Sequence, residues 1–350
     1  MPSLDWKLSS YSYNLPESLI AQHPTSNRDQ SRMLFIDRSE GIISHRKFYE
    51  IITLLPKNSC LVLNNTKVLP VRLPGKRETG ASIEALLIEE IAGKNWRAIL
   101  RKAGRIREGE RLNFCGGKIC ATALERKNGG EWILEFETPD SIKERLEKVG
   151  LIPLPPYIKR DNTNENQNIK DKERYQTCFA TNPGAIAAPT AGLHFTTEIL
   201  DSIKDRGIEI LEVTLHVGLG TFNPIKKEDI RDHHMHAEYF SISSNTLSKL
   251  QSFKKLKKPI ICTGTTSVRV LETLALNNYE KNFGWTDLFI YPPYKFRLVQ
   301  GLLTNFHLPK STLLMMVSAF YGREKLLEAY RSALDEKYRF FSFGDCMFIL

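Results

Sequence analysis

The residues best suited to chemistry lie close together in DHHMHAEYF (232–240), which holds three of the chain's eight histidines, one Asp and one Glu. If residues 237–242 form a strand that extends backward, His234, His236 and Glu238 project from one face, because side chains alternate along a strand. Such a set could hold a metal with open positions, or could move protons with carboxylates tuning the histidines. Spacing alone favours a third interpretation, half-exposed histidines at the start of a strand.

Three further segments place a histidine in a turn between regular elements: 188–200, 214–224 and 302–316. In the first, a glycine-containing turn enters a helix near residue 196, so its backbone N–H groups could meet an anion. The residues of interest are Pro189, Thr190, Ala191, Gly192 and His194 in the first, His216, Gly218, Gly220 and Thr221 in the second, and Thr304, Asn305 and His307 in the third.

Two segments resemble nucleotide-binding loops without their full spacing. GLG (218–220) lacks the third glycine of a dinucleotide loop, and Asn-Pro follows where a helix should start. CTGTTSVRVLE (262–272) reads as strand, turn and helix, which puts Gly264, Thr265 and Thr266 at the carboxyl end of a strand, where α/β sheets bind ligands. It has no Gly-Lys-Ser/Thr, so ATP hydrolysis is disfavoured. A single basic, metal-free pocket with several histidines would explain the placement of all these turns.

The elements around these motifs predict an α/β body with an all-β block. Six short β-type runs between about 66 and 138 are separated by turn signals such as CGGK and KNGGE, which is typical of a small antiparallel barrel. From residue 175 onward strands and helices alternate as in a layered sheet, with TDLFIY (286–291) as one of the strands. The polar run 161–172 reads as a mobile loop.

The composition sets the general class. The chain has 350 residues and a formal net charge of +9, which favours an acidic partner such as nucleic acid. Its six cysteines are scattered without a C-x-x-C pair, which indicates free thiols in a reducing compartment. No signal-peptide pattern occurs, and the longest apolar run is about half of the ~20 residues that a membrane span needs. We therefore expect a cytoplasmic protein.

RKAGRIREGER (101–111), inside the β block, is a basic stretch with four arginines and one lysine. Such a stretch could lie along the phosphates of a nucleic acid, and a solvated strand–turn face is equally compatible with it. Its candidate contacts are Arg101, Lys102, Arg105 and Arg107.

Taken in order, several unusual segments resemble the S-adenosylmethionine:tRNA ribosyltransferase-isomerase family of queuosine biosynthesis, over essentially the whole chain. The segments are LVLNNTKVLPVRL, PLPPYIKR, PTAGLHF, TLHVGLGTF, DHHMHAEY, GTTSVR, TNFHLPKSTL and EKYRFFSFGDCMFI. The resemblance implies an α/β main domain with an inserted small antiparallel barrel. We expect the discontinuous α/β catalytic domain to comprise 1–64 plus 156–350 and the inserted barrel to comprise 65–155.

The resemblance also implies a reaction. The family transfers and isomerises the ribosyl part of S-adenosylmethionine onto 7-aminomethyl-7-deazaguanine at the wobble position (34) of tRNA, which gives epoxyqueuosine and releases adenine and methionine. S-adenosylmethionine is consumed as a co-substrate, and no metal, nicotinamide or flavin cofactor is implied. The expected partners are this tRNA and S-adenosylmethionine, without a membrane, and a monomer is the default expectation.

The family's D-H-x-M-H-x-E pattern falls on Asp232, His233, His236 and Glu238, which shifts the choice from His234 to His233. His194, His216, Arg269, Thr304, Asn305 and His307 match their motifs directly. The chemistry requires a base with a pKa near neutral for the carbon beside the sulfonium and an acid for the departing adenine. Hydroxyl and amide donors such as Thr265, Thr266 and Asn305 suit the charge that develops on the ribose oxygens. Which histidine is base and which is acid stays open.

Two other functions remain as alternatives. A metal-dependent hydrolase or oxygenase would be centred on His234, His236 and Glu238. A noncatalytic RNA-binding protein would use the β block as its binding module.

Overall fold

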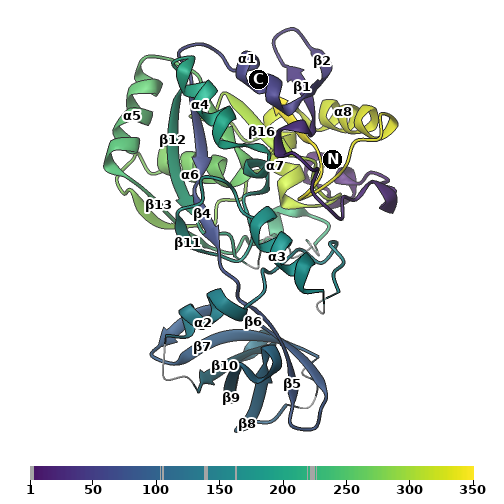
Figure 1. Cartoon of the computed structure of the whole chain (residues 1–350). Coiled ribbons are helices and arrows are strands. Elements are labelled where there is room, and N and C mark those ends of the chain that lie inside the picture. Colours follow the sequence, from purple (N-terminus) through teal and green to yellow (C-terminus); the bar gives the residue numbers. More distant parts are fainter. Residues whose placement is uncertain are drawn as a thin grey trace. The chain divides into compact units, whose positions relative to one another are not determined.

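The structure, a computed structural model, describes residues 4–102, 104, 106–137, 141–161, 164–218, 220, 225 and 227–350. The contacts between residues divide the chain into two compact units (Figure 1). The first comprises Met1–Lys67, Thr177–Asn182 and Ala188–Leu350, and the second comprises Val68–Gln176 and Pro183–Ala187. A mixed sheet with helices in one unit and a closed barrel in the other confirm the predicted fold class.

A nine-stranded mixed sheet forms the framework of the first unit, in the order β15-β13-β12-β3-β14-β16-β17-β1-β2. The strands are β15 (Phe283–Thr286), β13 (Glu238–Ile242), β12 (Glu209–Leu215), β3 (Cys60–Asn64), β14 (Ile260–Thr263), β16 (Gly301–Asn305), β17 (Cys346–Ile349), β1 (Arg32–Asp37) and β2 (Ile42–Lys47). The four strands β12, β3, β14 and β16 run parallel to one another. Strands β3, β14 and β16 are buried along their whole length, which explains their continuous apolar sequences.

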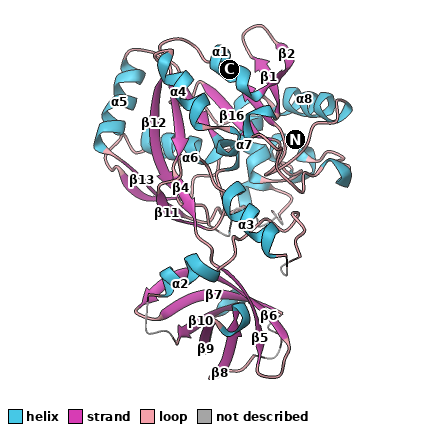
Figure 2. Cartoon of the chain, in the orientation of Figure 1, coloured by secondary structure: helices cyan, strands magenta, loops and turns pink. Residues whose placement is uncertain are grey.

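Helices cover both faces of this sheet (Figures 1 and 2). They are α1 (Ile51–Leu54), α4 (Thr197–Asp205), α5 (Ser244–Lys255), α6 (Gly264–Leu276), α7 (Thr312–Tyr321) and α8 (Arg323–Asp335). Leu61 and Leu63 of β3 belong to one apolar cluster with Ile199 and Ile203 of α4. Asn64, on the opposite face of β3, instead bonds to α6, so α4 and α6 lie on opposite faces.

The second unit is built on a closed barrel in the order β10-β7-β6-β5-β8-β9. Its strands are β5 (Arg72–Arg77), β6 (Ser82–Ala92), β7 (Asn95–Arg101), β8 (Glu110–Phe114), β9 (Ile119–Arg126) and β10 (Glu131–Phe136). Five of them fall on predicted runs, whereas β5 overlaps the first predicted run, at 68–73, only at Arg72 and Leu73. Gly116 and Gly129 adopt positive φ angles of 70° and 77° in the predicted turns, a conformation that side chains other than glycine rarely adopt. A separate two-stranded sheet pairs β4 (Thr66–Val68) with β11 (Asn182–Ala185).

The predicted loop at 161–172 is wrong from residue 165 onward, because helix α3 (Glu165–Arg174) begins there. It follows helix α2 (Ile142–Val149). Asn164 caps α3 by accepting a hydrogen bond from the backbone N–H of Gln167 at 3.0 Å. Asp171 of α3 forms a buried ion pair with Arg160 at 2.7 Å. Residues 156–176 therefore group with the barrel unit, whereas the sequence had suggested the α/β domain.

The predicted strand at 286–291 is also displaced. The strand is β15 (Phe283–Thr286), and residues 287–291 have no regular structure. Arg269 of α6 donates hydrogen bonds to the backbone carbonyl of Thr286 at 2.9 Å and to that of Leu288 at 3.2 Å. At this point a side chain, rather than a neighbouring strand, binds the backbone. The local sequence gives no sign of this contact.

Candidate active site

The predicted segments meet at one edge of the sheet. Strands β3, β12, β14 and β16 are parallel, so their carboxyl ends lie together, as at the ligand-binding edge of other α/β sheets. The antiparallel strand β13 begins at the same edge. This edge therefore carries the residues that end or follow these strands, together with the start of β13: Asn64, His216, Gly264, Asn305 and Glu238.

His216 follows β12 and is half-buried. Its Nδ1 lies 2.8 Å from the hydroxyl of Thr66, and its ring stacks on that of Tyr239 at 6.1 Å between centroids and an angle of 18°. Partial burial lowers the pKa of His216 below its ordinary value. The imidazole is therefore neutral at neutral pH and able to accept a proton.

Glu238 and Arg269 form a buried pair, with 6% and 4% of their surfaces exposed. Arg269 donates from Nη1 to the carboxylate of Glu238, whose other oxygen accepts the backbone N–H of Gly218 at 2.8 Å. The carboxylate is thus occupied in holding the glycine turn after β12 against α6. The structure places Glu238 as an anchor of this turn.

Gly220, in the same turn, lies against His236. A Cβ on Gly220 would come within 2.4 Å of Cδ2 and 2.7 Å of Cβ of that histidine, so only glycine fits without displacing it. Of the two other predicted residues in this turn, Gly218 is the one that Glu238 holds, and Thr221 lies outside the described residues.

The histidines before β13 differ in environment. His233 is half-buried with its ring 5.3 Å from that of Phe289, and its pKa is lowered by burial first and then by the neighbouring histidine charges. His234, His236 and Asp232 are exposed. Because β13 starts only at Glu238, the premise of a strand that places His234, His236 and Glu238 on one face is wrong. Within the described residues, no group of three His, Cys, Asp or Glu side chains is arranged to hold a metal ion.

The start of α6 supplies the hydroxyl groups of the site. Gly264 opens the helix with φ at +80°, and a Cβ there would lie 3.7 Å from Ala191 of the Pro189–His194 turn. The hydroxyl of Thr266 accepts a hydrogen bond from Asn64 Nδ2 at 3.1 Å. Thr265 is buried beside it. The first N–H groups of α6 have no partner within the helix, so they can bind oxygen atoms of a ligand.

Two of the predicted histidines are enclosed in the protein. His194 accepts from Ser31 at Nδ1 (2.7 Å) and donates from Nε2 to Asn305 Oδ1 (3.3 Å), and burial lowers its pKa to about 4. His307 contacts the hydroxyl of Thr304 through Nε2 at 2.8 Å, and burial lowers its pKa to about 3. Both rings are neutral at neutral pH, and His194 orients Asn305.

Some site residues escaped the sequence analysis. Asn64 and Thr66 were visible as polar residues ending a buried strand in LVLNNT, which is a usable signal. Ser31 and Tyr239 carried no such signal, because their contacts to His194 and His216 join distant parts of the chain.

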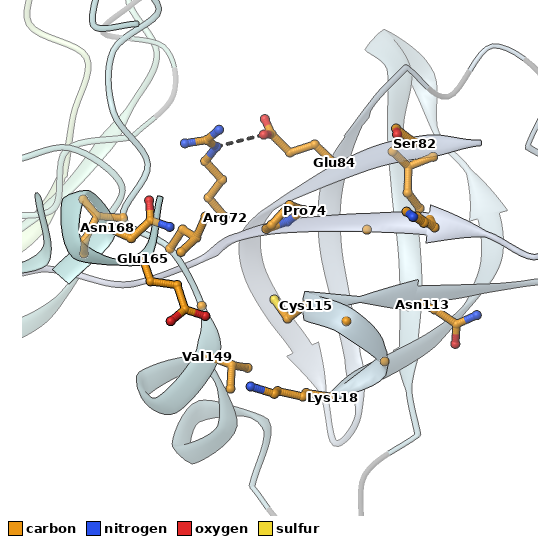
Figure 3. A pocket seen from close by; sticks show the side chains of 18 of the residues that line it. Arg72, Pro74, Ser82, Glu84, Asn113, Cys115, Lys118, Val149, Glu165 and Asn168 are labelled. Atoms are coloured by element: carbon orange, nitrogen blue, oxygen red, sulfur yellow. Dashed lines mark hydrogen bonds and ion pairs between the residues drawn. The ribbon is translucent and has the colours of Figure 1, made fainter. Parts of the chain in front are cut away.

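The barrel unit contains a second, basic feature, a cavity of about 1150 Å³. It is lined by β5, β6, the turn at 115–118 and helices α2 and α3 (Figure 3). Seven cations and two carboxylates line it: Arg72, Lys76, Arg101, Lys102, Lys118, Lys148, Lys172, Glu84 and Glu165. We call it the barrel groove. Arg107 lies outside its lining, and Arg105 lies outside the described residues.

Comparison with known proteins decides the family. The family model described as "Queuosine biosynthesis protein" matches residues 8–349. The chain belongs to this family. It is 47% identical over 346 residues to the S-adenosylmethionine:tRNA ribosyltransferase-isomerase of Acetivibrio thermocellus and 48% identical to that of Staphylococcus haemolyticus, with 98% of this chain and 99% of each relative covered.

A solved structure agrees with this family membership. The crystal structure of S-adenosylmethionine tRNA ribosyltransferase from Thermotoga maritima is 37% identical, with a TM-score of 0.55. The likeness covers 97% of this chain and 100% of that one. Separately, none of the described helices is long and apolar enough to cross a membrane.

Proposed function

We propose that this member of the queuosine family transfers and isomerises the ribosyl part of S-adenosylmethionine onto 7-aminomethyl-7-deazaguanine at position 34 of tRNA. The products are epoxyqueuosine in tRNA, adenine and methionine. The observation that carries the proposal is that the family's motifs, matched over the full chain, come together at one edge of the sheet. We also propose that the protein works as a cytoplasmic monomer without a bound metal or redox cofactor.

The histidines divide into two roles by their accessibility. We assign the proton transfers to His216, His233 and His236, which are half-buried or exposed. Two of these, His216 and His233, have lowered pKa values and are therefore neutral at neutral pH, which suits a base for the carbon beside the sulfonium. The enclosed His194 and His307 act as positioning residues.

The start of α6 suits the polar groups of S-adenosylmethionine. Its first backbone N–H groups, which have no partner within the helix, can bind a carboxylate or ribose hydroxyls together with Thr265 and Thr266. The side-chain oxygen of Thr263 at the helix start is buried and has no hydrogen-bond partner among the described residues. A ligand hydroxyl would satisfy it.

We further propose that the barrel groove binds phosphates of the tRNA. Arg101 and Lys102 from the predicted basic stretch line it, whereas Arg107 does not. Lys76 and Lys118 are exposed and have no ion-pair partner among the described residues, so their charges are available to an anionic backbone. Glu84 is already neutralised by Arg72 at 2.8 Å.

Adenine release tests the proposed reaction. Purified, EDTA-treated protein is mixed with S-adenosylmethionine and tRNA carrying 7-aminomethyl-7-deazaguanine, and free adenine and the mass of the modified nucleoside are followed. We expect adenine together with a ribosyl-derived mass gain. His233→Ala and His236→Ala should each lower the rate by about 10²-fold if they transfer protons, with folding and tRNA affinity retained.

The same assay separates the alternatives. Adenine that appears only after a metal is restored would favour the metal-dependent enzyme. Tight tRNA binding by folded protein without any adenine would favour the noncatalytic RNA-binding protein.

A further inference from the structure

Three aromatic side chains form a row across neighbouring strands at the candidate active site. Tyr239 of β13 pairs with Trp285 of β15 in the strand register. On the other side, the backbone N–H of His216 donates to the carbonyl of Tyr239 at 3.0 Å. Side chains that are directly opposite in a sheet point to the same face, so His216, Tyr239 and Trp285 share one face.

The rings of this row are in contact. Tyr239 stacks on His216 at 6.1 Å and 18°, and Trp285 meets Tyr239 edge-on at 5.7 Å and 70°. The row starts half-buried at His216 and ends at Trp285, of which 68% is exposed. Trp96 and Trp132 are only 4% and 3% exposed. Core packing therefore does not explain Trp285, and a large exposed aromatic beside a site points to a binding role.

The face of an indole or phenol ring suits an unpaired nucleobase. RNA loops are recognised by stacking their splayed bases on aromatic side chains. A nucleotide that reacts beside His216 must leave its own stack, which exposes the neighbouring base. We propose that Tyr239 and Trp285 form a stacking platform for the unpaired base that adjoins the reacting nucleotide. This inference rests on the proposed RNA substrate.

A second copy of the chain is a less suitable occupant. Strand β15 lies at the edge of the sheet, but it has only four residues and contains Gly284 at a φ of 157°. Such a short, glycine-containing edge is poorly suited to pairing with another strand. The row is also continuous with His216, which an interface between copies would not require.

The test measures RNA binding in the absence of S-adenosylmethionine, so that it does not depend on turnover. Wild type, Trp285→Ala and Trp285→Phe are titrated against a fluorescently labelled tRNA anticodon stem-loop. We expect Trp285→Ala to weaken binding about 5- to 100-fold and Trp285→Phe to stay within about threefold of wild type, because phenylalanine keeps an aromatic face.

Phe283→Ala is the matched control. Phe283 lies on the same strand, two residues away, is 56% exposed and pairs with Ser241 rather than with Tyr239. Its removal should change the affinity less than about twofold. Tryptophan fluorescence gives a second readout: RNA should quench the emission of wild type, and the quenching should be mostly lost in Trp285→Phe.

Several results would overturn the platform. Unchanged RNA affinity in Trp285→Ala is one. A higher KM for S-adenosylmethionine in Trp285→Ala, with unchanged RNA affinity, would show that the row holds adenine instead. An equal loss of RNA affinity in Phe283→Ala, with a dimer in wild type that Trp285→Ala dissociates, would show an interface between copies.

The platform and the proposed reaction can fail separately. RNA-dependent quenching in a protein that releases no adenine would leave the platform standing and reject the proposed reaction.

Discussion

Gly220 illustrates how a single missing side chain positions a histidine at this site. A Cβ on Gly220 would collide with Cβ, Cγ and Cδ2 of His236, so the whole imidazole must move in Gly220→Ala. A displacement near 1 Å at a reacting group lowers rates by up to about 10²-fold. We expect adenine release to slow about 10- to 100-fold while the melting temperature changes little.

Gly104→Ala is the control for this substitution, because a Cβ there meets no atom within 4 Å. It should leave the rate unchanged. A Gly220→Ala variant of wild-type activity would remove His236 from the proton-transfer set proposed above.

The enclosed imidazole of His194 makes stability depend on pH. Burial, with the charges of Arg28 and Arg339, lowers its pKa from 6.5 to about 4 despite the bond to Asn305. The unfolded chain therefore binds more protons between these values, so the contribution of His194 is complete above pH 6.5 and is lost as the pH falls toward 4. Between pH 7 and pH 5 this amounts to about 2 kcal/mol.

Urea unfolding at the two pH values measures this effect. His194→Gln should lose about 2 kcal/mol less than wild type over the interval, although it starts from a lower stability at pH 7. An equal pH dependence in the two proteins would mean that the ring is protonated in the folded state.

At the scale of elements, one ion pair joins α6, β13 and the turn after β12. Arg269→Met would leave the Glu238 carboxylate buried without its partner, which destabilises proteins by about 3–5 kcal/mol. Because Gly218 depends on the same carboxylate, activity should fall as well. Adding Glu238→Gln to Arg269→Met should restore part of the stability, since no charge is then buried.

The exposed pair between Lys249 and Glu209 serves as the comparison, with both side chains 45% exposed. Lys249→Met should change the free energy of unfolding by less than about 1 kcal/mol. Similar values for Lys249→Met and Arg269→Met in urea unfolding would contradict the anchoring role of Arg269.

At the scale of the whole molecule, we assign the chemistry to the α/β unit and phosphate binding to the barrel unit. The double variant Lys76→Ala/Lys118→Ala should weaken tRNA binding and reduce the slope of log K against log salt by about one per lysine removed. The KM for S-adenosylmethionine should not change. Anisotropy titrations at several salt concentrations give both quantities.

Arg107→Ala is the control here, because Arg107 belongs to the same basic stretch but lies outside the barrel groove. Its salt slope should match that of wild type. If Arg107→Ala weakens binding as much as the double variant does, the phosphates contact another face of the barrel.

The sequence by itself determined the family, the fold class and five of the six barrel strands. Those features depend on short stretches of sequence: ordered motifs, apolar alternation and glycine turns such as the one at Gly116. Helix starts are local features as well: the side chains of Thr196 and Ser311 cap α4 and α7.

Tertiary structure alone decided which site residues can meet a substrate. His194 pairs with Asn305 across 111 residues and Glu238 with Arg269 across 31, so neither burial nor partner can be read from spacing. Other contacts between distant residues are the hydrogen bond from Arg269 to the last residue of β15, Thr286, and the ion pair between Arg160 and Asp171 of α3. The pKa of a histidine follows its burial and its neighbours, which only the folded chain brings together.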